Sequence, residues 1–214
     1  MGIEVERLDG PADVDWDSLV DRSPMGSVFH RTAVLDVLAD HSGGRLHLLA
    51  GYKGQEVVGL FPLFELRKGP VSTVFSPPPR LGVPGLGPVL TNYGKLKRKK
   101  QDRRTKQFVE GSLDWLDREV DPKYTHVETT PGFRDARPFT WADYDVTPRY
   151  TYELDLTEGT EAVLEGFKGN LRSEVRRHED ADFEVFVGGD DAIEFIIDQV
   201  QSRFEEQGKT YAIG

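Results

Sequence analysis

Three strand-like segments follow one another in the first half of the sequence, and they constrain the fold more than any other feature. They are RLHLLAGY from Arg45, EVVGLFPLFELRK from Glu56 and VSTVFS from Val71. Turn residues separate them, Lys53-Gly54 in the first case and Lys68-Gly69-Pro70 in the second. Connections this short join neighbouring antiparallel strands. The segment therefore predicts an antiparallel meander.

Helices and further strands are expected on both sides of this meander. Trp16 and Leu19 mark the buried side of a short helix, and Val34, Leu35 and Leu38 mark that of a second. We therefore predict the α/β (α+β) class, with a mixed, largely antiparallel sheet flanked by helices. Further strands are expected at Ile3–Leu8, after the loop Ser76–Leu90, and at Tyr124–Thr130, Tyr144–Thr147, Tyr150–Leu156 and Phe183–Val187, and helices at Asp15–Val20, Thr32–Ala39, within Lys95–Val120, and at Ala192–Glu206.

A further helix is predicted over Thr160–Asp180. Gly166 and Gly169 weaken it, so two short helices with a bend near Gly169 are an equally good interpretation. Apolar residues recur about every four positions and predict one buried face. These residues are Val163, Leu164, Phe167, Leu171 and Val175.

Beside this apolar face, Lys168, Arg172 and Arg176 are spaced four residues apart, and Arg177 adds a fourth cation. Residues at this spacing lie on one edge of a helix. In a chain of formal net charge −10 they indicate a site for an anion, such as a phosphate, a carboxylate or a nucleic-acid backbone. The alternative is a solvated face with ordinary ion pairs, Glu174 with Arg177 and Arg176 with Asp180.

Two other segments carry a phosphate-binding hypothesis and a structural alternative. Gly82, Gly85 and Gly87 lie in a proline-rich loop without a GxGxxG or Walker pattern, so we expect a structural turn. The run KLKRKKQDRRTK from Lys95 could contact phosphates of RNA or of a coenzyme. Its alternatives are a solvated helix start or a disordered loop, and base stacking is not indicated because no aromatic residue is interleaved.

No catalytic residue can be named from the sequence. The chain has 5 histidines without metal-ligand spacing and no cysteine, so neither a metal site nor a thiol nucleophile is expected. Glu65, between Phe64 and Leu66, could be a partly desolvated base. The favoured alternative is an outward-facing residue of an alternating strand.

Composition limits the setting in which the chain works. It has 214 residues, with Lys+Arg 27 against Asp+Glu 37, so it is acidic. This surplus fits adaptation to high salt, and plain acidic solubility fits almost as well. No apolar run reaches the roughly 18 residues of a membrane span, and no signal peptide begins the chain, so a cytoplasmic location is expected.

The region from Pro148 to Lys209 resembles the FemAB-like and BioF2-like branch of the GNAT acyltransferase superfamily. The shared pattern is an aromatic-rich strand ending in Asp-Leu, an acidic turn, the motif Phe-Lys-x-x-x-Arg-x-x-Ile-Arg-(Lys/Arg)-Ala-x-x-x-Gly, and then a Val-x-Val-like strand. The sequence departs from it where His178 replaces the alanine and Asp182 replaces the glycine. SPMGSVFHRTAVLDVLADHSG, VVGLFPLFELRKG and LGPVL resemble the family's first domain. The matching residues are Tyr150, Tyr152, Asp155, Leu156, Phe167, Lys168, Arg172, Val175, Arg176 and Arg177.

This resemblance implies two GNAT-like domains in tandem. Residues 1–148 would form the first, and residues 149–214 the incomplete start of a second, so the chain is expected to be truncated at its C-terminus. The usual pyrophosphate motif is absent, because Gly82 stands where Gln or Arg belongs before Gly85-Leu86-Gly87.

The resemblance also implies an activity. It is the transfer of an acyl or aminoacyl group from acyl-CoA or aminoacyl-tRNA to an amine on a small molecule, glycan or peptide. Lys168, Arg172 and Arg176 would hold the anionic substrate or donor phosphates, and no cofactor is bound permanently. The alternatives are a non-catalytic GNAT-scaffold module that binds an anionic glycan or RNA, and an inactive fragment.

Overall fold

The computed structural model describes residues 2–179, 184 and 186–209. The chain divides into two compact units, one ending at Pro148 and the other beginning at Arg149. Whether the second unit is the start of a second GNAT-like domain stays a prediction.

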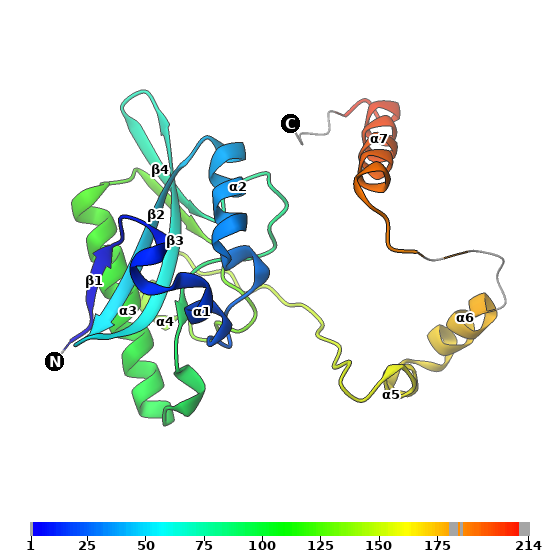
Figure 1. Ribbon diagram of the computed structural model, residues 1–214, viewed down its shortest axis with the longest axis horizontal. Coiled ribbons are helices and arrows are strands. Elements are labelled where there is room, and N and C mark those ends of the chain that lie inside the picture. The colour runs from blue at the N-terminus through cyan, green and yellow to red at the C-terminus, as the bar shows by residue number, and fades with distance from the viewer. Residues whose placement is uncertain (1, 180–183, 185, 210–214) are drawn as a thin grey trace. The chain divides into compact units, whose positions relative to one another are not determined.

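The first unit is built on one mixed sheet with the strand order β1-β2-β3-β4-β6, and β5 pairs separately with β3 (Figure 1). All neighbours are antiparallel except β4 and β6, which are parallel. The predicted meander is therefore confirmed as β2, β3 and β4. The strands are β1 (Glu4–Arg7), β2 (Arg45–Lys53), β3 (Glu56–Lys68), β4 (Val71–Ser76), β5 (Val89–Leu90) and β6 (Tyr124–Val127).

Helices cover both faces of this sheet. In Figure 1, α1 (Trp16–Asp21) and α2 (Thr32–Ser42) lie on one face, and α3 (Arg98–Glu119) lies on the other. The short helix α4 (Arg137–Trp141) contacts α3. Gly43 ends α2 in the left-handed conformation that favours glycine. The helices predicted in the first unit, including one within Lys95–Val120, are confirmed.

The core lies where α3 crosses the middle of the meander. Gly51 of β2 pairs with Gly59 of β3, and the ring of Phe108 from α3 lies over both glycines. A side chain at either glycine would occupy the space of this ring. Phe61, Leu49 and Phe108 are all fully buried, so both the sheet and the helix contribute to the packing.

Hydrogen bonds to its backbone groups hold the loop between β4 and β5 to the rest of the first unit. The Ser76 hydroxyl donates to Pro62 O (2.7 Å) and accepts from Gly87 N (3.0 Å), and Leu86 N donates to Glu128 O (2.7 Å). Buried His30 adds a contact from its Nε2 to Gly87 O (3.2 Å). The predicted structural turn is confirmed, and the amides of Leu86 and Gly87 are already used inside the protein.

Two predicted strands in the second half of the chain are wrong. Tyr144–Thr147 and Tyr150–Leu156 form neither helix nor strand, and the Tyr152 side chain is 99% exposed. Alternating residues form a strand only where a neighbouring edge accepts their backbone hydrogen bonds, and within the described part of the chain no strand pairs with these residues. The predicted strand Phe183–Val187 lies partly outside the described residues.

The described residues of the second unit form three helices, α5 (Thr160–Gly166), α6 (Gly169–Glu179) and α7 (Asp190–Glu206). The chain is extended at Phe167, which confirms the interpretation with two short helices. The predicted buried face is wrong for the described residues, because Leu171 is 41% exposed and the other four apolar residues are half-buried at most. An apolar stripe is buried only by an opposing surface, and none of the described residues of this unit is buried.

Among the described residues, no helix is both long and apolar enough to cross a membrane.

Candidate functional site

In the predicted cationic edge, Lys168 lies just before α6, and Arg172 and Arg176 lie within it. Lys168 and Arg176 are exposed, and Arg172 is half-buried. The alternative ion pair of Glu174 with Arg177 does not form, since Arg177 Nε donates instead to Ser173 O (3.4 Å). The pair of Arg176 with Asp180 lies outside the described residues. Lys168, Arg172 and Arg176 remain a predicted anion site.

Glu65 does not face solvent, and the favoured prediction for it is wrong. It pairs with Arg45 across β2 and β3, on the face that α3 covers, and is only 3% exposed. Its carboxylate accepts hydrogen bonds from His47 Nε2 (2.9 Å), Arg67 Nε (2.5 Å) and Ser72 Oγ (3.0 Å). Glu65 therefore belongs to a buried polar network.

The electrostatics of this network hold Glu65 in its charged form and make its carboxylate a weak base. Burial raises the pKa of the Glu65 carboxyl, but the hydrogen bonds from His47, Arg67 and Ser72 outweigh it and lower the pKa to about 2. Burial also lowers the pKa of His47, against the opposing effect of Glu65. A neutral His47 donates from Nε2 to the carboxylate. Its ring contacts the ring of Trp115 edge-on, with the two ring centroids 5.5 Å apart. These groups stabilise the packing of α3 on the sheet.

A pocket of about 270 Å³ lies at the carboxyl ends of the parallel strands β4 and β6. We call it the β4–β6 pocket. Phe75 from β4 and the alternate residues Tyr124, His126 and Glu128 form one wall, because residues two apart on a strand face the same side. The rest of the lining comes from the loop after β4, with Pro77, Pro78, Pro79, Arg80, Gly82 and Val83.

The course of the chain after β4 creates this pocket. Parallel strands end at the same edge of a sheet, and here the chain turns away at the cis bond between Ser76 and Pro77. It returns at Leu86, which bridges to Thr129 in parallel. The intervening loop therefore stands beside the strand ends and closes one side of the pocket.

The pocket brings together a base and aromatic surfaces. His126 Nε2 lies 3.1 Å from Glu128 Oε1, with side-chain exposures of 44% and 29%. The rings of Tyr124 and His126 are parallel, with centroids 6.3 Å apart, and the ring centroids of Phe75 and Tyr124 are 5.8 Å apart. An imidazole that a carboxylate orients can act as a general base. The arrangement can therefore serve a proton transfer at a ligand between the strand ends and the loop.

Sequence reasoning missed this pair of residues. His126 and Glu128 lie two apart within the predicted strand Tyr124–Thr130, which places both on one face. That spacing was the available signal. The loop that completes the pocket could not be found in this way, because its return to Thr129 is a contact between distant parts of the chain.

A second pocket, of about 160 Å³, lies beside the first turns of α3. Most of the basic run that begins at Lys95 forms the start of this helix, so the interpretation as a helix start is confirmed and the disordered loop is wrong. We call this second pocket the α3 pocket. Its lining residues are Ile3, Lys53, Leu96, Lys100, Arg103, Arg104 and Gln107.

No group of three or more His, Cys, Asp and Glu side chains among the described residues is placed to hold a metal ion.

His30, the most deeply buried histidine of the described residues, has a structural position. Burial lowers its pKa to about 4, against the smaller opposing effect of backbone hydrogen bonds to Gly87 and Leu86. Neutral His30 thus fixes the loop after β4 without carrying charge.

No protein-family model matches the chain, and no curated protein sequence matches it. Its fold is similar to that of a GNAT family acetyltransferase from Staphylococcus aureus, with 12% identity, 72% of this chain and 100% of that chain covered, and a TM-score of 0.39. It is also similar to a ribosomal-protein-alanine N-acetyltransferase from Brucella melitensis biovar Abortus, with 9% identity, coverage of 72% and 99%, and a TM-score of 0.41. A transcriptional regulator from Bacillus halodurans has 10% identity, coverage of 72% and 99%, and a TM-score of 0.38. TM-scores this low do not establish a shared family or activity.

Proposed function

We propose that the protein is an acyltransferase of the GNAT type, which transfers an acyl group to an amine acceptor. The β4–β6 pocket carries this proposal, because ligands of mixed α/β sheets bind outside the carboxyl ends of parallel strands. The order of elements supports it: one strand, two helices, an antiparallel meander, a long helix and a parallel strand. The sequence resemblance to the FemAB-like branch points to the same chemistry.

In this proposal His126 and Glu128 carry the proton transfer. His126 removes a proton from the acceptor nitrogen, while Glu128 orients the imidazole and stabilises its charged form. A C–N bond forms as the C–S bond of a thioester or the C–O bond of an aminoacyl ester breaks. The proton then passes to the leaving sulfur or oxygen. Tyr124 and Phe75 provide the flat surface against which the acceptor is positioned.

The donor is proposed to be acyl-CoA or aminoacyl-tRNA, and its phosphates need a site of their own. The amides of Leu86 and Gly87 in the loop after β4 do not offer one, since they bond to Glu128 O and Ser76 Oγ. We propose that Lys168, Arg172 and Arg176 hold the donor phosphates or an anionic part of the acceptor.

The first test removes the base. His126→Ala and Glu128→Gln are each expected to lower kcat for transfer from acetyl-CoA to an amine by about a hundredfold, since general bases contribute at least this much. Release of free thiol measures turnover, with a panel of small-molecule and peptide amines as acceptors. His41→Ala removes an exposed histidine of α2 and is the matched control. Unchanged turnover in both pocket variants would remove this pair from the mechanism.

The second test reverses the cationic edge. Changing Lys168, Arg172 and Arg176 together to Glu is expected to raise the KM of the donor at least about tenfold, with a smaller effect on kcat, because these groups bind without reacting. A control changes the exposed residues Lys123, Arg203 and Lys209 to Glu and so alters net charge equally. Equal KM values in both triple variants would refute the clamp and leave the proposal for His126 standing.

A further inference from the structure

The α3 pocket lies near the opposite edge of the sheet from the β4–β6 pocket. Its residues come from the segment before β1 (Ile3), the end of β2 (Lys53), the loop before α3 (Leu96) and the first three turns of α3. β1 and β6 are the two ends of the strand order, so the two pockets use different strands. Any ligand of the α3 pocket therefore binds separately from the site proposed for acyl transfer.

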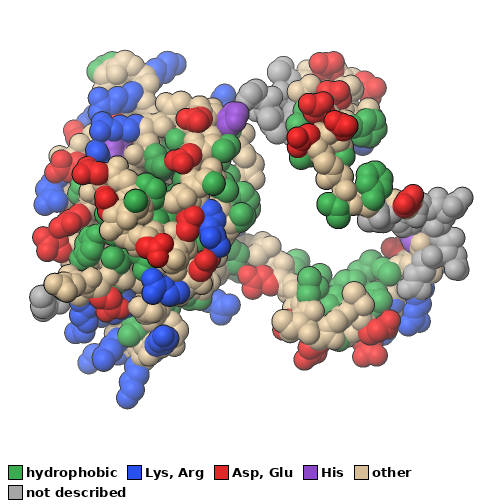
Figure 2. Space-filling view, in the orientation of Figure 1, with side chains coloured by type: hydrophobic (Ala, Val, Ile, Leu, Met, Phe, Trp, Pro, Cys, Tyr) green, Lys and Arg blue, Asp and Glu red, His purple; other side chains and the backbone are tan. Residues whose placement is uncertain are grey.

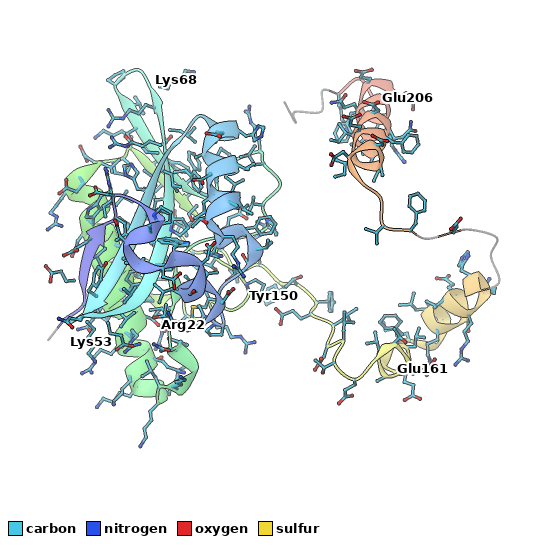
Figure 3. The ribbon with its side chains drawn as sticks, in the orientation of Figure 1. Arg22, Lys53, Lys68, Tyr150, Glu161 and Glu206 are labelled. Atoms are coloured by element: carbon cyan, nitrogen blue, oxygen red, sulfur yellow. The ribbon has the colours of Figure 1, made fainter. Side chains whose placement is uncertain are left out.

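Four cationic side chains line this pocket, namely Lys53, Lys100, Arg103 and Arg104. Figure 2 shows Lys and Arg side chains gathered at the lower end of the first unit, where α3 begins, and Figure 3 labels Lys53 there at the turn after β2. A chain of formal net charge −10 does not concentrate cations in one hollow by composition alone. Their mutual repulsion is relieved when an anion enters.

Arg104 is the fixed member of the group. It is only 8% exposed, its Nη1 donates to Thr91 O (3.3 Å), and the same nitrogen lies 3.8 Å from Glu56 Oε1. These contacts hold one end of the guanidinium, and an arginine has five N–H donors in a rigid fork. Arg104 therefore lines the pocket with a charge whose position is set before any ligand binds.

The other three cations have no neutralising partner among the described residues. The acidic neighbours on α3 are engaged elsewhere, Asp102 with Arg98 and Arg137, and Glu110 with Lys106. Within the part of the chain that the structure describes, no hydrogen bond or ion pair joins the side chains of Lys53, Lys100 or Arg103 to another group. The pocket thus offers three exposed, unpaired cations around one buried guanidinium.

The size of the pocket limits its occupant. A volume of about 160 Å³ lies below the roughly 300 Å³ at which pockets for drug-sized ligands begin. No aromatic side chain lines it, so stacking with a base does not contribute. Its polar lining is all cationic except for Gln107. These properties suit a compact group with several charged oxygens, because guanidinium and ammonium donors bind phosphate oxygens strongly.

We propose that the α3 pocket is a binding site for a phosphate or pyrophosphate group, carried either by a free inorganic ion or by a small nucleotide. Inorganic pyrophosphate and adenosine diphosphate are the two probes, titrated calorimetrically into the whole chain. If pyrophosphate and adenosine diphosphate bind with equal affinity, the site recognises the phosphate groups alone and its ligand is the free ion. If adenosine diphosphate binds more tightly, its ligand is a nucleotide. Citrate supplies multivalent carboxylates, and if it binds as tightly as pyrophosphate the preference for phosphate is refuted.

The matched variants separate the pocket from general charge. Lys100→Gln with Arg103→Gln is expected to weaken pyrophosphate binding about tenfold or more. Lys53→Gln, which changes a lining residue of β2 and not of α3, is expected to weaken the same binding. Lys97→Gln with Lys99→Gln removes two exposed cations beside the pocket that do not line it, and should leave affinity nearly unchanged. Absence of pyrophosphate binding by the unaltered chain, or equal weakening in both double variants, would overturn the proposal. Binding is measured without turnover, so failure of acyl transfer would not affect the result.

Discussion

Phe108→Ala is expected to destabilise the first unit by about 3–5 kcal/mol, which is a large part of the roughly 5–15 kcal/mol that holds a domain together. Phe108 is fully buried, and its ring fills the space above Gly51 and Gly59 in the middle of the meander. Alanine leaves a cavity that neither glycine can fill. Urea unfolding followed by tryptophan fluorescence reports on the first unit, since Trp16, Trp115 and Trp141 all lie in it.

A second substitution shows whether the cost comes from this contact. A Cβ on Gly59 would lie 2.6 Å from Phe108 Cδ1, so Gly59→Ala alone should destabilise by about 1–3 kcal/mol through overpacking. In the Phe108→Ala background the new methyl group enters the cavity, and its cost should fall by about 1 kcal/mol or more. Gly94→Ala, where nothing lies within 4 Å, is the control and should be nearly neutral. Additive effects of Phe108→Ala and Gly59→Ala would contradict this packing.

The same region explains how far the sequence predicts the fold. Gly54 and Gly69 mark the two turns of the meander, and apolar periodicity places Phe108 and Leu116 on the buried side of α3. Those signals are local, and they were sufficient to predict the meander and the helix. Glu65 was placed wrongly because alternation identifies an outward residue only when one face of a sheet is exposed to solvent. Here helices cover both faces, and a polar residue in that position is buried with its partners.

The remaining errors have the same physical origin. Tyr150 and Tyr152 alternate like strand residues, yet a strand also needs a pairing edge that their own sequence does not specify. The β4–β6 pocket depends on the return of the loop at Leu86 to Thr129, and the α3 pocket depends on Lys53 lying near the start of α3. Sequence spacing could place His126 and Glu128 on one face. It could not predict that the loop after β4 lies opposite them and completes the β4–β6 pocket.

Glu65→Gln is expected to destabilise the first unit by about 3 kcal/mol near pH 7, because it removes a buried charge that accepts hydrogen bonds from buried His47 and Ser72 and from exposed Arg67. The loss should depend on pH. The folded pKa of Glu65 is lowered from its ordinary value of 4.5 to about 2, so on acidification the unfolded chain binds the proton first. The stability that the carboxylate contributes is therefore complete above about pH 4.5 and is lost as the pH falls towards 2.

This dependence separates a buried carboxylate from a merely well-packed side chain. The difference in unfolding free energy between the unaltered chain and Glu65→Gln should shrink between pH 5 and pH 3, whereas Glu4→Gln, at an exposed position of β1, should cost little at either pH. A difference that stays constant with pH would mean that the charge of Glu65 is not what stabilises the fold. Turnover per folded molecule should be unchanged in Glu65→Gln, because a carboxyl with a pKa of about 2 that accepts three hydrogen bonds is too weak a base to take a proton from an amine. Loss of turnover in a fully folded Glu65→Gln protein would instead move the proton transfer from His126 to the interior of the sheet.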